Sequence, residues 1–354
     1  MERKVAIIGC MGVPAKYGGF ETLAHQLVSN NSREVSYVVY CSAIAYKKNE
    51  RLKTFNNAEL VYLPISANGM RSIFYDILSI IHALTKARVL LILGVSGAVI
   101  IPILRLLFPR HKFITHIDGM EWKRKKWGVA TQKFLKFSER IAVKYSNEVI
   151  ADNQGIVDYV TETYNKRSWL LTYGADHHQY EESHLIDNYA FSVCRIEPEN
   201  NVHVVLEAFS KVPTVKLKFI GNWENSKYGK DLYQQYSSVQ NIELIHPIYD
   251  QGKLDKIRGN CKIYIHGHSA GGTNPSLVEA MYLELPIFAF DVSFNRYTSA
   301  NKAMYFKNTE QLIQLLVQIQ QIDLTTMATN LKKIANEKYI WNKVVREYEH
   351  LFLQ

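Results

Sequence analysis

The chain has 354 residues, a formal net charge of +9, and a content of 47% apolar and 21% charged residues. Its length allows two domains of ordinary size, and its composition excludes a disordered or fibrous protein. The four cysteines show no metal-binding spacing, so we interpret them as buried, reduced thiols of a cytoplasmic protein.

The start of the chain and one apolar stretch decide the expected location. A strand is predicted at residues 4–8, so we expect no signal peptide before it. Residues 89–108 are about as long as a membrane span, but two glycines, Pro102 and Arg105 interrupt them. This stretch divides into a buried strand, 89–93, and a helix from about 97 to 107. We therefore expect a cytoplasmic chain without a transmembrane helix.

The first half of the chain alternates strand-like and helix-like segments. Strands are predicted at residues 5–9, 34–41, 59–63, 89–93, 112–116 and 148–152. Helices are predicted at residues 20–29, 73–84, 97–107 and 130–145. Such alternation indicates a mostly parallel sheet with helices on both faces.

The loop between the first strand and the first helix is rich in glycine. Gly9, Gly12, Gly18 and Gly19 do not have the spacing of the dinucleotide-binding fingerprint. No acidic residue follows the second strand to bind a ribose, so a nicotinamide enzyme is disfavoured. The loop is either a ligand-facing segment at the carboxyl edge of the sheet or a tight turn.

The positive charge is concentrated between Trp122 and Lys144, where the chain has eight basic residues and one acidic residue. On the predicted helix, Lys133, Lys136, Arg140 and Lys144 form a stripe beside an apolar stripe. Such a helix either binds an anionic membrane surface or packs into the core with a solvated basic side. Nucleic acid is not expected as a partner, because no binding motif accompanies the charge.

A second α/β unit is predicted after the polar segment 176–184. Its strands are expected at residues 189–194, 215–220, 242–245, 262–265 and 286–290, and its helices at 202–210, 254–259, 275–285 and from 309 onward. The expected fold is α/β, with two Rossmann-like, doubly wound domains at residues 1–185 and 186–339. A terminal helix at about 340–354 is expected to pack back on the first domain.

Residues 266–281 combine the end of a strand, a glycine turn and the start of a helix. Asn274 suits the N-cap, Pro275 suits the first helical position, and Pro286 stops the pattern. Free backbone N–H groups and the helix dipole make this an anion site. Glu279 lies about one turn inside the helix, where it can accept hydrogen bonds from hydroxyl groups. The sequence therefore indicates a ligand with a diphosphate and sugar hydroxyls.

Four segments together resemble bacterial glycosyltransferase family 4, a family with the GT-B fold. Within it they resemble the rhamnosyltransferase-like subgroup of capsule and cell-wall polysaccharide synthesis. The segments are residues 12–21, 118–127, 195–201 and 267–281. The resemblance implies transfer of a sugar from a nucleotide donor, with retention of the anomeric configuration and without a bound metal. Independently, the chain has no Asp-x-Asp pair and no zinc-like spacing, so we expect no metal and no cofactor.

The resemblance also implies roles at the donor site. Glu279 would hold the ribose of the nucleotide. Arg195 would meet the donor diphosphate, a role that suits a permanently charged, planar guanidinium. The other expected donor contacts lie in the glycine turns and at the start of the helix: Gly18, Gly19, His268, Gly271, Gly272, Thr273, Asn274 and Ser276.

Two positions depart from the family pattern. Most members carry a second glutamate eight positions before the one on the ribose, where this chain has Gly271. Most also carry a lysine near the position of Asn200 or Asn201, where this chain has none. These departures leave open how the transferred sugar and the charge of the leaving group are held.

Candidates for positioning the acceptor or the reacting sugar lie at the end of a first-domain strand. They are His116, Asp118 and Glu121; alternatively, they cap the strand end and pair with nearby lysines. We hypothesise that Arg195 and the helix that begins after Asn274 stabilise the departing diphosphate. The acceptor hydroxyl then attacks from the face that the diphosphate leaves.

The donor that the resemblance implies first is dTDP-rhamnose, with UDP-glucose, UDP-galactose or an N-acetylhexosamine donor as alternatives. A lipid-linked or oligosaccharide acceptor would suit a basic first domain, peripheral on the inner face of the cytoplasmic membrane. Two other functions stay open. One is a nucleotide-sugar epimerase of the same fold, and the other is a non-catalytic nucleotide-sugar binder, which the absent glutamate and lysine favour.

Overall fold

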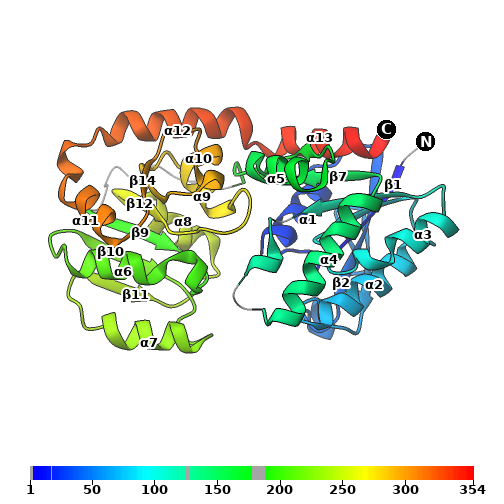
Figure 1. Cartoon of the computed structure of the whole chain (residues 1–354), viewed down its shortest axis with the longest axis horizontal. Coiled ribbons are helices and arrows are strands. Elements are labelled where there is room, and N and C mark those ends of the chain that lie inside the picture. Colours follow the sequence, from blue (N-terminus) through cyan, green and yellow to red (C-terminus); the bar gives the residue numbers. More distant parts are fainter. Residues whose placement is uncertain (1–2, 17, 118, 125–126, 178–187) are drawn as a thin grey trace. The chain divides into compact units, whose positions relative to one another are not determined.

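The computed structural model describes residues 3–16, 18–117, 119–124, 127–177 and 188–354. The chain forms two compact units (Figure 1). Unit 1 comprises Met1–Tyr173 and Trp341–Gln354, and unit 2 comprises Gly174–Ile340. The boundary expected from the sequence, after residue 185, lies outside the described residues.

Unit 1 contains an eight-stranded sheet in the order β3-β4-β2-β1-β5-β6-β7-β8. Neighbouring strands are parallel except for β3 and β4. All five side chains of β5 are buried, as expected for a parallel strand covered on both faces. The strands are β1 (Arg3–Ile8), β2 (Val35–Ser42), β3 (Thr54–Phe55), β4 (Ala58–Leu63), β5 (Val89–Leu93), β6 (Lys112–Ile117), β7 (Glu148–Ala151) and β8 (Trp169–Leu170).

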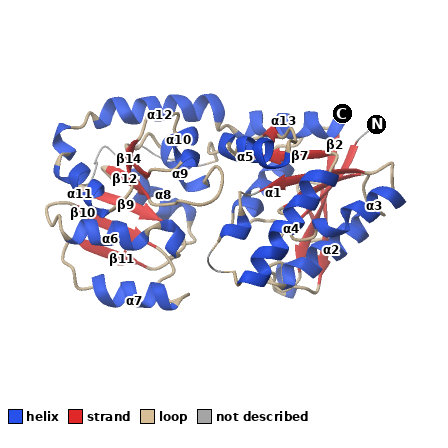
Figure 2. Cartoon of the chain, in the orientation of Figure 1, coloured by secondary structure: helices blue, strands red, loops and turns tan. Residues whose placement is uncertain are grey.

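Helices cover this sheet, and α2 and α4 lie in front of its strands in Figure 2. The helices are α1 (Gly19–Ser29), α2 (Arg71–Ala83), α3 (Ile101–Leu107), α4 (Val129–Tyr145), α5 (Gln154–Tyr164) and α13 (Trp341–Leu353). The last of these, α13, packs against α1 and β1. Over the described part of the chain, none of the helices has the length and apolarity needed to cross a bilayer.

Unit 2 contains a six-stranded parallel sheet in the order β11-β10-β9-β12-β13-β14. Its strands are β9 (Tyr189–Val193), β10 (Lys216–Ile220), β11 (Ile242–Ile245), β12 (Ile263–His266), β13 (Ile287–Phe290) and β14 (Met304–Phe306). Its helices are α6 (Val202–Ser210), α7 (Lys227–Tyr236), α8 (Gln251–Gly259), α9 (Pro275–Tyr282), α10 (Ser293–Thr298), α11 (Thr309–Val317) and α12 (Leu324–Lys338).

The structure differs from the sequence prediction in several helices. Helix α9 ends at Tyr282 and not at residue 285, because Glu284 has a positive φ of 56°, which a helix cannot contain. Helices α5, α7 and α10 were not expected from the apolar pattern. Helix α7 is mostly polar, with Gly229, Leu232 and Tyr236 as its buried residues, and α10 is only six residues long.

Each sheet has one place where the order of strands reverses. It lies between β1 and β5 in unit 1, and between β9 and β12 in unit 2. The loops that leave the carboxyl ends of two such strands turn in opposite directions and leave a crevice. In open α/β sheets this crevice is the usual ligand site. Each unit therefore has one favoured place for a site.

Candidate functional site

In unit 2 the loop after β12 ends at the N-terminus of α9. Asn274 is the N-cap: its Oδ1 accepts hydrogen bonds from the Ser276 backbone N–H (3.1 Å) and the Ser276 hydroxyl (2.8 Å). Thr273 is buried, and Gly271 and Gly272 lie in the preceding turn. The positive end of the α9 helix dipole lies at this turn, so this end of α9 suits an anion.

The loop after β9 is hydrogen-bonded to the loop after β12. The backbone N–H and hydroxyl of Ser269 both donate to the Glu199 carbonyl oxygen, at 2.9 and 2.7 Å. The Asn201 side chain donates to the Gly267 carbonyl oxygen at 2.8 Å. A Cβ at Gly267 would lie 2.2 Å from the Asn200 carbonyl oxygen, so the contact requires glycine. The two loops are thus fixed together at the point of strand reversal.

Arg195 lies just after β9, at the start of this pair of loops. Its side chain is exposed. Within the described part of the chain, no hydrogen bond or ion pair engages its guanidinium. The Asn200 side chain donates to the Arg195 carbonyl oxygen at 2.6 Å and so fixes its backbone. The guanidinium is therefore available to an anionic ligand on a fixed support.

Glu279 forms a buried ion pair inside α9. Arg258 of α8 donates from Nη1 to Glu279 Oε2, and from Nη2 to Asp255 Oδ1 at 2.7 Å. The Arg258 side chain is 1% exposed. Burial opposes its charge, but the two carboxylates outweigh burial and raise the pKa of Arg258. Glu279 is therefore held in place by a permanently charged partner, which the sequence pattern alone did not single out.

Two histidines stack after β12. The rings of His266 and His268 have centroids 4.5 Å apart and an interplanar angle of 16°. His266 is fully buried, and burial lowers its pKa to about 3, so the ring is neutral. The His268 carbonyl oxygen accepts a hydrogen bond from the Asn295 side chain at 2.9 Å. Among the described residues, no group of three or more His, Cys, Asp or Glu side chains could hold a metal ion.

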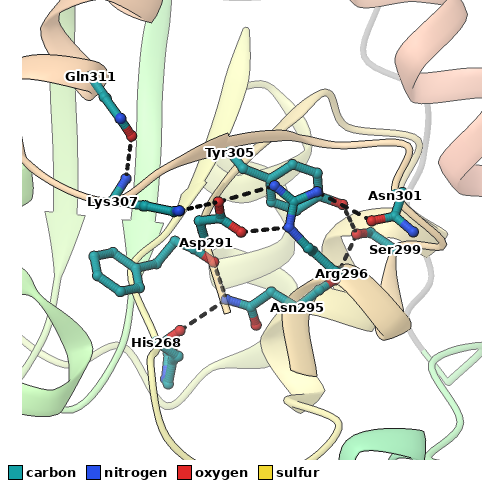
Figure 3. A network of polar contacts seen from close by, with 10 residues as sticks. His268, Asp291, Asn295, Arg296, Ser299, Asn301, Tyr305, Lys307 and Gln311 are labelled. Atoms are coloured by element: carbon teal, nitrogen blue, oxygen red, sulfur yellow. Dashed lines mark hydrogen bonds and ion pairs between the residues drawn. The ribbon is translucent and has the colours of Figure 1, made fainter. Parts of the chain in front are cut away.

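A polar network after β13 supports this loop (Figure 3). Asp291 pairs with Arg296, whose guanidinium carbon lies 4.1 Å from the centre of the Tyr305 ring. The hydrogen bonds from Arg296 lower the pKa of Asp291. Asn295, on the same short helix as Arg296, is the residue that holds the His268 loop. Three neighbouring strand ends thus support one another.

Unit 1 has a pocket of about 210 Å³ at its own point of strand reversal. Its lining includes residues after β1, β5 and β6: Gly9, Val95, Ser96, Gly119, Glu121, Arg124 and Trp127. Glu121 accepts a hydrogen bond from Trp127 Nε1 at 2.9 Å and pairs with Arg124 Nε at 2.8 Å. The indole ring of Trp127 lies beside the carboxylate of Glu121 and the guanidinium of Arg124. This combination suits a small ligand with several polar groups.

Asp76 of α2 is a buried carboxyl in the lining of the same pocket. Burial raises its pKa well above the ordinary value, and a hydrogen bond with Ser96 opposes this shift only in part. No sequence pattern marks Asp76, because it lies on the inner face of an otherwise apolar helix. The pocket therefore holds a carboxyl group that favours its neutral form.

The candidate residues of the first domain differ in their position relative to the pocket of unit 1. Glu121 lines the pocket, whereas His116 is buried and does not. The His116 ring lies against Phe20, with centroids 5.2 Å apart, and burial lowers its pKa to about 3. His116 is therefore neutral. Asp118 lies outside the described residues.

Local structure explains one glycine of the glycine-rich loop after β1. Gly18 is the N-cap of α1 with φ of 122°, and Gly19 is the first helical residue. A Cβ on Gly18 would lie 2.0 Å from Glu21 Oε2. Glu21 itself is buried and accepts a hydrogen bond from the Met11 N–H at 2.7 Å. The positive φ is therefore enough to require glycine at position 18.

The two halves of the chain match different families. Residues 2–176 match the domain of unknown function DUF1972, and residues 176–334 match Glycosyl transferases group 1. The second half therefore resembles the glycosyltransferase group 1 family. A curated relative, glycosyltransferase 1 domain-containing protein 1 of Xenopus tropicalis, is 21% identical over 229 residues and covers 62% of this chain. The chain spans 65% of the length of that relative.

Solved GT-B structures resemble this chain over all or most of its length. Sucrose-phosphate synthase of Thermosynechococcus elongatus has a TM-score of 0.82 at 12% identity and covers 100% of this chain and 99% of its own. OtsA has a TM-score of 0.69 at 9% identity, with the same coverage of 100% and 99%. TarM of S. aureus, in complex with fondaparinux, alpha-GlcNAc-glycerol and UDP, has a TM-score of 0.59 at 13% identity, with coverage of 75% and 55%.

These likenesses confirm the predicted GT-B fold, with two Rossmann-like domains. The family match, the curated relative and the structural neighbours together support the predicted class of enzyme, a glycosyltransferase. Membership of family 4, the rhamnosyltransferase subgroup and the absence of a metal stay predictions.

Proposed function

We propose that this glycosyltransferase is a retaining member of family 4 that moves a hexose from a nucleoside diphosphate to a saccharide. One observation carries the proposal: three kinds of group converge where the strand order of unit 2 reverses. They are the exposed Arg195 guanidinium, the positive end of the α9 helix dipole, and Glu279 held by Arg258. A cation and N–H donors suit a diphosphate, and a fixed carboxylate suits the hydroxyls of a ribose.

The same groups account for the chemistry we propose. As the bond between the anomeric carbon and the diphosphate oxygen breaks, negative charge grows on the diphosphate. Arg195 and the N-terminus of α9 stabilise that charge, and electrostatic stabilisation of this kind is commonly the largest catalytic effect. The acceptor oxygen bonds to the anomeric carbon on the face that the diphosphate leaves, and its proton passes to the leaving diphosphate. Retention then requires neither an enzymic nucleophile nor a metal.

For the donor sugar we propose L-rhamnose carried by dTDP. Gly271 occupies the place of the second family glutamate, and a Cβ there would meet nothing within 4 Å. The transferred sugar would therefore lie against open backbone and not against a carboxylate. A 6-deoxy sugar such as rhamnose has one hydroxyl fewer than glucose, so it requires fewer polar partners. The other nucleotide hexoses are the alternatives.

For the acceptor we propose a lipid-linked saccharide of cell-surface polysaccharide synthesis, bound in the pocket of unit 1. Trp127 offers a flat apolar face to a sugar ring, while Glu121, Arg124 and Asp76 offer polar groups to its hydroxyls. The TarM complex, which contains UDP and a GlcNAc-glycerol, supports a nucleotide and a saccharide as the two ligands of this fold. We propose a cytoplasmic enzyme, peripheral on the inner face of the membrane.

This proposal is tested by measuring the turnover of nucleotide sugars in variants that each lack one exposed basic side chain. Arg195→Ala should lower kcat/KM by about 100-fold or more, because the growing charge loses its cation. Lys230→Ala removes an exposed cation from α7 of the same unit and should leave kcat/KM unchanged. Circular dichroism melting should remain cooperative in both. Equal activity of the two variants would show that Arg195 does not bind the donor.

The choice of donor and of reaction is tested separately. A thermal-shift screen over dTDP, UDP, GDP and their sugars should give the largest stabilisation with dTDP-rhamnose, since a ligand bound to the folded state raises its stability. Product analysis with and without acceptor then separates the reactions. Isomerised donor without acceptor would indicate an epimerase, and tight binding without turnover would indicate a non-catalytic binder.

A further inference from the structure

Three helices of unit 1 expose an unusual number of large apolar side chains. On α2, Phe74, Leu78 and Ile81 are 66%, 46% and 47% exposed, and they follow one another at helical spacing. On α3, Leu106 and Leu107 are 82% and 63% exposed. Single exposed apolar residues are ordinary, but a contiguous set marks an interaction surface.

The three helices are linked to one another. Near the start of α4, the Thr131 hydroxyl donates to Met70 Sδ at 3.3 Å, just before α2 begins. At the other end of α4, Arg105 of α3 donates to the Tyr145 carbonyl oxygen at 2.7 Å. Figure 1 shows α2, α3 and α4 together in unit 1. We call the exposed side chains of these three helices the α2–α4 face.

The charge of the α2–α4 face is of one sign. Asp76 and Glu139 are the two carboxylates in the sequences of α2, α3 and α4, and both residues are buried, at 5% and 1% exposure. Glu139 is occupied by hydrogen bonds from Tyr159 and Tyr164. In contrast to these carboxylates, five basic residues of the three helices are exposed: Arg71, Arg105, Lys133, Arg140 and Lys144.

We propose that the α2–α4 face binds the surface of an anionic lipid bilayer. The cations meet the headgroups, and the apolar side chains of α2 and α3 enter the interface between headgroups and acyl chains. A second copy of this chain is a poorer occupant, because a symmetric contact would bring the same cations together. The basic stripe on α4 supplies charge, and α2 and α3 supply the apolar residues that the stripe lacks.

The face adjoins the pocket of unit 1. Met70 and Thr131, which link α2 to α4, also line that pocket. A saccharide on a membrane lipid would therefore reach the pocket from the edge of the bound face. This step rests on the proposed function, whereas membrane binding by the face does not.

Co-sedimentation with vesicles tests the proposal, using phosphatidylcholine alone or mixed with phosphatidylglycerol. The wild type should bind the anionic vesicles at low salt and be released at high salt. Leu106→Ser combined with Leu107→Ser should lower the partition coefficient at least about tenfold. Lys133→Gln combined with Arg140→Gln should lower it roughly 25-fold, at about fivefold for each cation. Val317→Ser and Lys230→Gln, exposed positions in unit 2, are the matched controls and should bind as the wild type does.

Several outcomes would overturn the proposal. These are no binding of the wild type to anionic vesicles at low salt, equal binding by the face variants and the controls, or binding to polyglutamate in place of vesicles. Transfer to a water-soluble acceptor should stay at the wild-type level in every face variant. A failure of membrane binding is thereby separated from a failure of the transferase reaction, which this soluble assay reports.

Discussion

Arg258 has two carboxylate partners and almost no exposure, so its removal would take the buried cation away from Glu279 and Asp255. Arg258→Met should therefore lower the free energy of unfolding by about 3–5 kcal/mol in urea titrations. Arg296→Met is the matched control, because that guanidinium also pairs with a carboxylate of unit 2 but is 41% exposed. It should cost about 1 kcal/mol or less. Equal losses of stability in the two variants would contradict a stabilising role for the buried ion pair of Arg258 with Glu279.

Asp76 gives a pH dependence of the opposite kind from a paired surface carboxylate. Burial raises its pKa, so the folded state holds the proton more tightly than the unfolded state does. The contribution of protonated Asp76 to the free energy of unfolding is complete below its pKa in the unfolded state, about 3.9. This contribution is lost as the pH rises toward its pKa in the folded state. Asp76→Asn cannot ionise and should be more stable than the wild type at about pH 7 but not at about pH 4. Urea unfolding at both pH values checks this, and a difference independent of pH would refute it.

At the scale of elements, the N-terminus of α9 should matter for both stability and binding. Asn274→Ala removes the cap and should cost about 1 kcal/mol of stability. It should also weaken nucleoside diphosphate binding in calorimetry, since the turn that leads into α9 loses the hydrogen bonds that fix it. Asn308→Ala removes the same kind of cap from α11, where Asn308 Oδ1 accepts from the Gln311 N–H at 3.0 Å. Asn308→Ala should lower the stability by a similar amount without weakening nucleotide binding. If both variants lost binding equally, α9 would not be part of the binding site.

The parts of the fold that the sequence predicts are those specified by neighbouring residues. The cap at Asn274 and Pro275, the apolar strand β5 and the glycine turn before α9 each depend on a few adjacent side chains. They were therefore predictable. Helix α7 has few apolar residues and α10 is only six residues long, so their sequences give less indication of a helix.

The candidate site shows the same division. Arg195 and Glu279 follow from motif positions, because their spacing from strands and caps is local. The contact of Arg258 with Glu279, and that of Asn201 with Gly267, join residues 21 and 66 positions apart. Asp76 enters its pocket from a helix whose sequence is mostly apolar. Contacts of this kind depend on the folded arrangement, so no spacing rule could indicate them.

At the scale of the whole molecule, the chain returns to unit 1 after completing unit 2. The Lys112 side chain donates to the Leu351 carbonyl oxygen at 2.8 Å, and Glu349 accepts from the Ser32 N–H at 2.8 Å. Tyr348 and Phe352 are fully buried among the residues of unit 1. Helix α13 therefore belongs to the core of unit 1, although it lies beyond unit 2 in sequence. Each unit thus has its own sheet, its own core and its own point of strand reversal.

The central claim is that the loops after β9 and β12 hold a nucleoside diphosphate, and hydrogen exchange with mass spectrometry tests it most directly. Saturating dTDP, UDP or GDP should slow exchange in residues 195–201 and 267–281 of the wild type, and less in Glu279→Gln at the same ligand concentration. Residues 216–220 form strand β10, which is already hydrogen-bonded to a strand on each side, and should not change. Slower exchange in other segments only, or no change with any of the three nucleotides, would contradict the account.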